Sequence, residues 1–329
     1  MSSTKPVPET KMMAGDELSA DDAWHALRRY GGWQLVRDAF IRFRYGDGFS
    51  HARALGLQLC LAIVPFMIAL AGLATAVGAK ESGEMVLDIA NALTPTPQSS
   101  DAIGALLHPS RSTQKAGEVA LVLGLLTGLA ALTTAMAQIE RGANRIYGVE
   151  RDRPALRKYL RAAVLTVCAG LPALAGFLVL AAGGAVGSSM RDHYGWGPTA
   201  ELSWQVARWP LSLGLTILAV SVLFRHAPRR RQPALSWLAF GAGLATALWW
   251  LASNLLAAYA RFGGSFGVTY GPLTGIMALL LWANLTGIAL FLGLSFAAQL
   301  EAIRVGVKAP AHPDRWEPKS ERKAARSSK

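Results

Sequence analysis

The chain has 329 residues and a net charge of +12 at pH 7; 52% of its residues are apolar and only 16% are charged. Globular proteins average about 25% charged residues, so this composition excludes a disordered chain. Two cysteines are too few for a disulfide-linked scaffold or a zinc cluster. The apolar residues stand in long uncharged blocks, which is typical of a membrane protein.

The first 53 residues divide into a polar arm, residues 1–31, and an amphipathic segment, residues 32–53. In the amphipathic segment, apolar side chains recur every three or four positions: Trp33, Val36, Phe40 and Phe43. Its basic side chains lie between or opposite them: Arg37, Arg42 and Arg44. The pattern predicts a basic amphipathic helix in the lipid headgroup layer, or a plain elbow that steers the chain into the membrane.

Six uncharged blocks follow, each a candidate for crossing a bilayer core of about 30 Å, which needs about 20 helical residues. They cover residues 54–77, 119–138, 162–186, 209–224, 237–260 and 272–300. The fourth block is the shortest and needs Trp204 to Arg208 as an interfacial lead-in. The predicted fold class is all-α: a polytopic membrane protein with six transmembrane helices over residues 54–301.

Two segments outside the blocks have a predicted character of their own. The connection over residues 80–118 predicts two short helices separated by Pro95 and Pro97, a small helical extracytoplasmic loop. The tail, residues 302–329, is rich in basic residues, Pro and Ser, which predicts a disordered basic cytoplasmic tail.

Lys and Arg alternate between the segments that flank the blocks. Of the 33 basic residues, 27 lie in residues 1–53, in the second and fourth connections and in the tail, and 6 lie in the other connections. Because cytoplasmic segments carry the basic excess, both termini are predicted to be cytoplasmic. The charge is therefore a topology signal: the expected partners are anionic lipid headgroups, and no nucleic acid is expected.

Catalytic signatures are missing from the sequence. It contains no HExxH, GxSxG or Walker A motif, and its six histidines are scattered. No ionisable residue lies in the middle of a block, which argues against a proton-driven pump. We therefore expect no enzyme, no catalytic residue, no metal and no cofactor.

Polar and aromatic residues at or near membrane depth are the candidate path or lipid-contact residues. They are Gln58, Pro65, Gln138, Glu140, Asn144, Arg145, Trp250, Asn254, Trp282 and Asn284. In one interpretation they form interhelical hydrogen bonds and headgroup anchors. In the other they line a cavity with an Arg-rich cytoplasmic mouth, suited to an anionic, lipid-like substrate.

Small residues and prolines predict how the helices pack. Small residues lie close together or four apart in the second and fifth blocks, a pattern that lets backbones approach closely: Gly124, Gly128, Gly241, Gly243, Ala245 and Ala247. We expect packing contacts there. Pro65 and Pro172 are expected to kink or interrupt their helices.

Three runs of the chain resemble the YihY/BrkB family of bacterial inner-membrane proteins. They are IERGANRIYGVERDRPALRKYLRA, LFRHAPRRRQPALSWLAFGAGLATALWWLASNLLAAYARF and SFGVTYGPLTGIMALLLWANLTGIALFLGLSFAAQLEAI. The most specific parts are Tyr270–Gly271, Leu279–Trp282 and the end at Glu301; Tyr270 joins the candidate path residues on this ground. The resemblance implies six spans and cytoplasmic termini. The family was once labelled ribonuclease BN, but the chain has no carboxylate cluster for a nuclease metal.

Two function classes remain open from the sequence. The first is a transporter or flippase-like carrier of a lipid or other amphipathic, anionic solute. The second is a non-transporting membrane scaffold or envelope-integrity factor, in which the amides only join helices. A membrane-associated nuclease is a distant third. The sequence sets neither the substrate nor the oligomeric state.

Overall fold

A computed structural model of the chain describes residues 4–9, 19–77, 114–149, 152–194, 197–262, 272–307 and 309–312. In these residues the protein is all-helical, which confirms the predicted fold class. Two short helices come first, α1 (Ala20–Tyr30) and α2 (Trp33–Tyr45). The predicted extracytoplasmic loop helices and most of the predicted tail lie outside the described residues.

Six long helices follow, and each contains one of the six predicted spans. They are α3 (Gly48–Val77), α6 (Gln114–Tyr147), α7 (Ala155–Tyr194), α8 (Pro198–His226), α9 (Leu235–Phe262) and α11 (Pro272–Arg304). All six are long and apolar enough to cross a membrane. The helix α8 includes the predicted lead-in, and α3 and α7 continue through Pro65 and Pro172.

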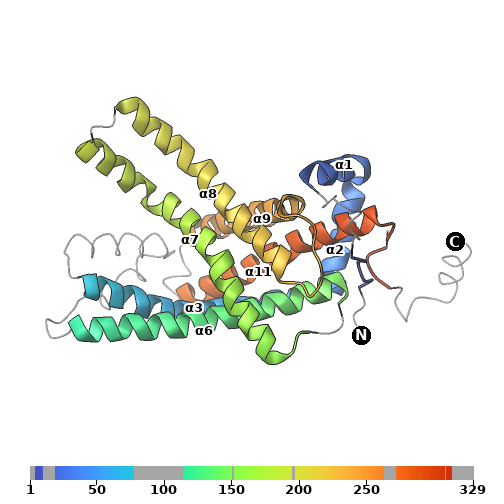
Figure 1. Ribbon diagram of the computed structural model, residues 1–329, viewed down its shortest axis with the longest axis horizontal. Coiled ribbons are helices and arrows are strands. Elements are labelled where there is room, and N and C mark those ends of the chain that lie inside the picture. The colour runs from blue at the N-terminus through green and yellow to red at the C-terminus, as the bar shows by residue number, and fades with distance from the viewer. Residues whose placement is uncertain are drawn as a thin grey trace, which may run out of the picture.

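The six long helices are arranged in a ring. Neighbouring contacts run from α6 to α3, α11, α9, α8, α7 and back to α6, and α6 also contacts α11. The pairs α3–α6 and α7–α8 form two long hairpins that diverge toward the left of the molecule (Figure 1). The hairpins therefore meet at one end of the ring and separate at the other.

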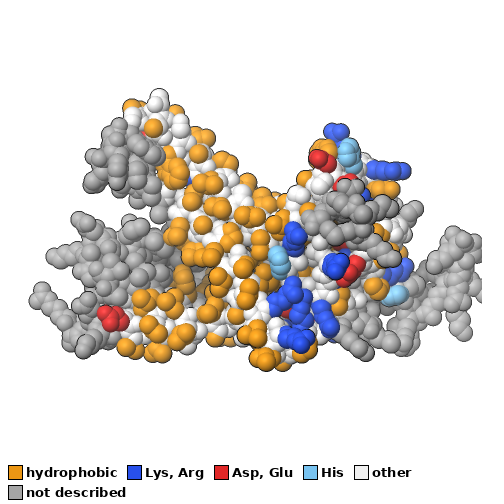
Figure 2. All heavy atoms as spheres, in the orientation of Figure 1, with side chains coloured by type: hydrophobic (Ala, Val, Ile, Leu, Met, Phe, Trp, Pro, Cys, Tyr) orange, Lys and Arg blue, Asp and Glu red, His pale blue; other side chains and the backbone are white. Residues whose placement is uncertain are grey.

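The two ends of the ring differ in composition. We call one the basic end: it holds α1, α2, the α6–α7 and α8–α9 connections and residues 4–9 and 309–312. Here Thr4 pairs with Ala311 in an isolated β-bridge, and the Lys5 N–H donates to Pro310 O at 3.0 Å. Lys and Arg side chains gather over this end, whereas apolar side chains cover the hairpins toward the other, which we call the opposite end (Figure 2).

The well-packed core lies at the basic end. Its largest fully buried apolar side chains come from α2, α6, α8, α9 and α11: Phe43, Tyr147, Phe224, Trp237 and Phe291. Along the hairpins, by contrast, large apolar side chains such as Val64, Leu126 and Leu171 are each more than 60% exposed. Exposure of this extent fits a lipid environment, in which such side chains lose nothing by facing outward.

Close helix contacts bring α3 and α9 against α11. A Cβ on Gly56 would lie 2.9 Å from the backbone nitrogen of Asn284, and one on Gly287 would lie 2.8 Å from Ala52 O. Gly241 and Gly293 face each other across α9 and α11 with equally little room. The predicted small-residue packing therefore holds for Gly241, whereas Gly243 meets nothing within 4 Å.

Candidate functional site

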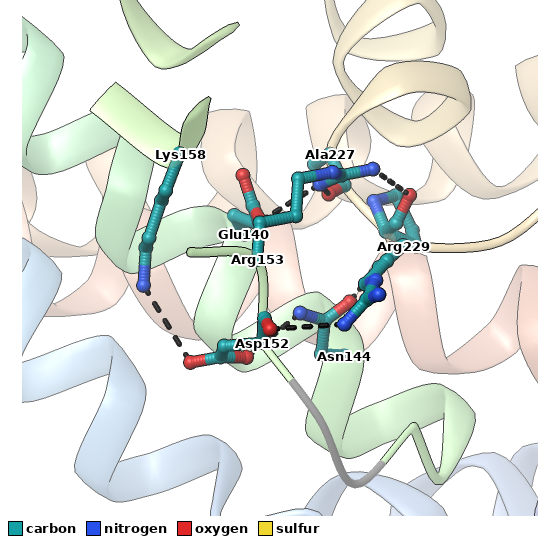
Figure 3. A network of polar contacts seen from close by, with 8 residues as sticks. Glu140, Asn144, Asp152, Arg153, Lys158, Ala227 and Arg229 are labelled. Carbon is teal, nitrogen blue, oxygen red and sulfur yellow. Dashed lines mark hydrogen bonds and ion pairs between the residues drawn. The ribbon is translucent and has the colours of Figure 1, made fainter. Parts of the chain in front are cut away.

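A buried ion pair connects α6 to the two connections at the basic end. Arg153 Nη1 lies 2.7 Å from Glu140 Oε1, and both side chains are nearly buried. The same guanidinium donates to the carbonyls of Ala227 and Pro228, at 3.2 and 3.1 Å. Arg153 thus joins the α6–α7 connection to the α8–α9 connection (Figure 3).

Asn144 lies at the centre of a second set of contacts one turn further along α6. Its Nδ2 donates to Asp152 Oδ1 at 2.9 Å, and its Oδ1 accepts from the backbone N–H of Arg229 at 2.7 Å. Lys158 Nζ lies 3.5 Å from Asp152 Oδ2 (Figure 3). Burial alone would raise the pKa of Asp152, but the Asn144 amide and the Lys158 ammonium outweigh it, so this pKa is lowered.

Arg42 of α2 forms a third cluster, and here the sequence interpretation is wrong. Arg42 was expected on the polar side of an amphipathic helix, yet it is fully buried. Its Nε donates to Gln299 Oε1 at 2.8 Å, and its Nη1 donates to the carbonyls of Lys5 and Ile146, both at 3.1 Å. Burial lowers the pKa of Arg42 to about 10.

The face of α2 that packs on the protein contains Leu35, Ala39, Arg42 and Phe43. Three of the four predicted apolar positions point outward instead: Trp33, Val36 and Phe40. The predicted helix is confirmed, but it has two apolar faces. One packs against protein, and the other is exposed and free to contact lipid.

Arg230 and Glu301 complete this cluster with a buried bidentate pair. Arg230 Nη2 lies 2.6 Å from Glu301 Oε1, and Arg230 Nη1 lies 3.1 Å from Glu301 Oε2. The Arg230 guanidinium carbon also lies 4.7 Å from the centroid of the Tyr147 ring. The pair joins the α8–α9 connection to the end of α11.

Three candidate residues nearer the middle of the spans are amides. Gln138 Nε2 donates to His51 Nδ1 at 2.9 Å, which joins α6 to α3. Gln58 Oε1 and Asn284 Oδ1 are buried and have no hydrogen-bond partner among the described residues. Buried polar atoms without partners are rare in proteins, and each calls for water, a ligand or another explanation.

The aromatic candidates divide between the interior and the surface. Trp282 donates its indole N–H to Ser253 Oγ at 3.1 Å and packs edge-on against Trp249. Trp250 is 61% exposed, and the exposed Asn254 donates back to Trp250 O of its own helix. These two residues are therefore exposed, whereas the amide oxygens of Gln58 and Asn284 are buried.

The remaining candidates are placed less centrally. Pro65 is half-buried in α3, and the half-buried Arg145 accepts the Thr4 hydroxyl on its backbone carbonyl at 2.7 Å. Tyr270 lies outside the described residues. The described candidates thus form no single site: Glu140 and Asn144 belong to the polar contacts of the basic end, Gln58 and Asn284 lie deeper, and Trp250 and Asn254 are exposed.

Sequence reasoning missed the partners that complete these contacts: Arg42, Tyr147, Asp152, Arg153 and Arg230. In the sequence, Leu35, Ala39 and Phe43 form a second apolar stripe along α2, and this stripe indicates that the neighbouring Arg42 is buried. In the part of the chain that the structure describes, no group of three or more His, Cys, Asp and Glu could hold a metal ion.

A helical ring with six apolar spans and a buried polar layer at one end defines an integral, multi-pass membrane protein. The family described as virulence factor BrkB matches residues 39–318, and the chain belongs to this BrkB/YihY family. No solved structure matches the chain.

Among named relatives, a Bacillus subtilis protein called ribonuclease-like protein YfkH is 26% identical over 79% of this chain and 92% of its own length. The UPF0761 membrane protein of Acinetobacter baylyi is 24% identical over 85% of this chain. That of Chromohalobacter salexigens is 26% identical over 80%. The chain covers 65% and 62% of the lengths of these two UPF0761 proteins.

Proposed function

We propose that this membrane protein is a non-enzymatic carrier of amphipathic, anionic molecules such as membrane lipids. The arrangement of the hairpins supports this proposal, because the ring is fixed at the basic end and its two long hairpins diverge at the other (Figure 1). In this proposal, an amphipathic solute enters from the lipid phase between the two hairpins.

The observation that carries the proposal is the pair of unpartnered amide oxygens. Gln58 Oε1 on α3 and Asn284 Oδ1 on α11 are buried within candidate spans. A buried polar group without a partner costs about 1–3 kcal/mol. A solute hydroxyl or ammonium, or water in a path, would supply the missing donor. These two residues are therefore the proposed contacts of the cargo.

The orientation is also a proposal: the basic end faces the cytoplasm, where anionic headgroups would contact its arginines. In a variant without Cys60 and Cys168, we expect Thr199→Cys at the start of α8 to react with an impermeant thiol reagent on intact cells. Ser236→Cys at the start of α9 should react only after lysis. Labelling of Ser236→Cys in intact cells would reverse the orientation.

Substitution of the two amides tests the carrier. Purified protein is reconstituted in vesicles with fluorescent phosphatidylglycerol, and its movement between leaflets is measured; lipid that co-purifies is identified by native mass spectrometry. Gln58→Leu and Asn284→Leu should each abolish movement and reduce co-purified lipid. Stability should change by only about 1 kcal/mol, the scale of hydrogen bonds within membranes.

Asn254→Leu is the matched control, because Asn254 is exposed and its side chain donates to Trp250 O of its own helix. We expect it to retain both movement and bound lipid. If the wild-type protein moves no lipid, or if all three leucine variants move it equally, the carrier proposal is wrong.

A non-transporting scaffold is the second candidate, favoured by the number of buried polar contacts that fix the basic end. It predicts a different outcome in cells. Any phenotype of Gln58→Leu or Asn284→Leu would then follow the amount of folded protein. Loss of phenotype at wild-type protein levels would exclude the scaffold.

A further inference from the structure

The described residues 4–9, which we call the N-terminal strap, lie against the basic end. The Val7 N–H donates to Tyr147 O at 3.1 Å, and the Thr4 hydroxyl donates to Arg145 O at 2.7 Å. Thr4 and Val7 are both buried there. The strap is therefore part of the packed structure and covers the cluster around Arg42 and Arg230.

Three residues of the strap accept hydrogen bonds from donors that lie beneath it. Lys5 O accepts from Arg42 Nη1 at 3.1 Å, and Pro8 O accepts from Arg230 Nη2 at 3.2 Å. The carboxylate of Glu9 accepts from the backbone N–H of Arg231 at 3.0 Å. The oxygen atoms of one short segment thus satisfy donors of Arg42, Arg230 and Arg231 that an anion could satisfy instead.

The charges beneath the strap are unbalanced. Arg230 takes both oxygens of Glu301 in its bidentate pair. Arg42 is fully buried, yet the acceptors that it contacts are all neutral: Gln299 Oε1 and the carbonyls of Lys5 and Ile146. Buried cations are normally paired with an anion, since removing them from water is costly. Two buried guanidinium groups here share a single buried carboxylate.

Donors at the same place also lack partners. Arg42 Nη2 and Arg230 Nε are buried and have no acceptor among the described residues. These groups lie on side chains that are at most 3% exposed. Arginine donors with this spare capacity suit an oxyanion that can accept several hydrogen bonds at once.

We propose that Arg42 and Arg230, with the Arg231 N–H, form a binding site for a phosphate group, and that the strap is its built-in competitor. When the strap leaves, phosphate oxygens accept from the guanidinium donors that Lys5 O and Pro8 O had occupied, and they reach the spare donors. The phosphate comes from a phospholipid headgroup or from free phosphate. The site stands apart from the amides Gln58 and Asn284, so it does not depend on the carrier proposal.

The experiment measures ligand binding to the full chain in detergent by isothermal titration calorimetry. The probes are inorganic phosphate, a soluble short-chain phosphatidic acid, and the matching diacylglycerol, which lacks the phosphate. Val7→Ser loosens the strap without changing a charge. We expect it to raise the affinity for a phosphate-bearing probe about tenfold, the equivalent of 1.4 kcal/mol lost from strap packing.

Two further variants test the site and the strap separately. In the Val7→Ser protein, Arg42→Gln should abolish the gain, whereas Arg44→Gln, an exposed arginine of the same helix, should retain it. A full chain with Thr4→Cys and Ala311→Cys, in a background without the native cysteines, should bind phosphate when reduced and lose at least tenfold in affinity when the disulfide pins the strap. The disulfide variant retains every arginine, so it still tests the proposal if Arg42→Gln does not fold.

The outcomes separate the sources of the phosphate. Binding of inorganic phosphate and phosphatidic acid with similar affinity supports the site with free phosphate as sufficient ligand. Binding of phosphatidic acid alone supports the site with a lipid headgroup as the ligand. Equal binding of phosphatidic acid and diacylglycerol, or an affinity that neither Val7→Ser nor the disulfide changes, overturns the proposal.

Discussion

The basic end and the opposite end of the helical ring are held by different kinds of contact. At the basic end, buried pairs such as Arg230–Glu301 and Arg153–Glu140 fix helices and connections against one another. Toward the opposite end, the hairpins α3–α6 and α7–α8 separate, and their large apolar side chains are exposed (Figures 1 and 2).

The difference shows what can specify helix packing inside lipid. Apolar side chains are as well solvated by lipid tails as by each other, so they supply little drive for helices to associate. The contacts that can still specify helix packing are ion pairs, hydrogen bonds and close approaches at glycine residues. In this protein the polar contacts are concentrated at the basic end, and glycines such as Gly56 and Gly287 extend the contact of α3 with α11.

The largest expected effect comes from removing the carboxylate of the basic end. Glu301→Ala leaves Arg230 and Arg42 buried without an acid. Breaking a buried pair by deleting one partner costs about 3–5 kcal/mol, and we expect this loss in the free energy of unfolding. The measurement is unfolding of the purified protein in mixed micelles, together with the amount that accumulates in the membrane.

The control for Glu301→Ala is an exposed pair at the same end. Arg304 Nη1 lies 3.2 Å from Asp22 Oδ1, and the two side chains are 36% and 39% exposed. Solvent screens such pairs, so Arg304→Ala should cost no more than about 1 kcal/mol. Equal losses in the two variants would show that burial does not distinguish the contacts of the basic end.

A smaller effect is expected at the contact between α9 and α11. An added Cβ on Gly293 would meet the backbone carbonyl of Gly241 and the Cβ of Ala245. Gly293→Ala must therefore push the helices apart, at a cost of about 1–3 kcal/mol in the free energy of unfolding. The same unfolding assay in micelles measures this loss.

Gly243→Ala is the matched control for Gly293→Ala, because nothing lies within 4 Å of its added Cβ. It should be neutral or slightly stabilising, since alanine favours a helix more than glycine does. A loss as large as that of Gly293→Ala would mean that the close α9–α11 contact at Gly293 does not explain the effect.

The sequence predicts the membrane helices well because one physical requirement determines them. A span needs enough consecutive apolar residues to cross the bilayer; five of the six blocks meet that requirement alone and the fourth does so with its lead-in, and each lies within one helix. The sequence predicts less well which face of α2 packs against the protein. The stripe through Trp33, Val36 and Phe40 and the stripe through Leu35, Ala39 and Phe43 are both apolar, and periodicity cannot tell lipid from protein as the surface that each contacts.

The candidate site shows the same limit. Gln138 and Glu140 could be chosen from their depth on one helix, but their partners His51 and Arg153 belong to other elements. Arg230 and Glu301 are 71 positions apart, so nothing in local spacing pairs them. Trp250 and Asn254 share a helix face as expected, but only the tertiary structure shows that this face is exposed.

The smallest expected effect depends on pH and concerns Asp152, at the edge of the basic end. Its pKa in the folded protein is lowered below the ordinary value of 3.8, so the folded state favours the charged carboxylate. Stability from this group is therefore present above pH 3.8 and is lost as the pH falls through the lower folded value. Because the side chain is 43% exposed, solvent limits the contribution to less than about 1 kcal/mol.

Asp152→Asn should therefore lower the melting temperature slightly at pH 7, and the difference from wild type should vanish once the pH lies below the lowered pKa of the folded protein, where the carboxyl is protonated in both states. Asp38 of α2 provides a control of opposite sign, because burial raises its pKa in the folded protein. Asp38→Asn should raise the melting temperature at pH 7 and lose that advantage in acid. If both variants shift in the same direction at pH 7, a general change in net charge, and not the contacts of Asp152 with Asn144 and Lys158, explains the result.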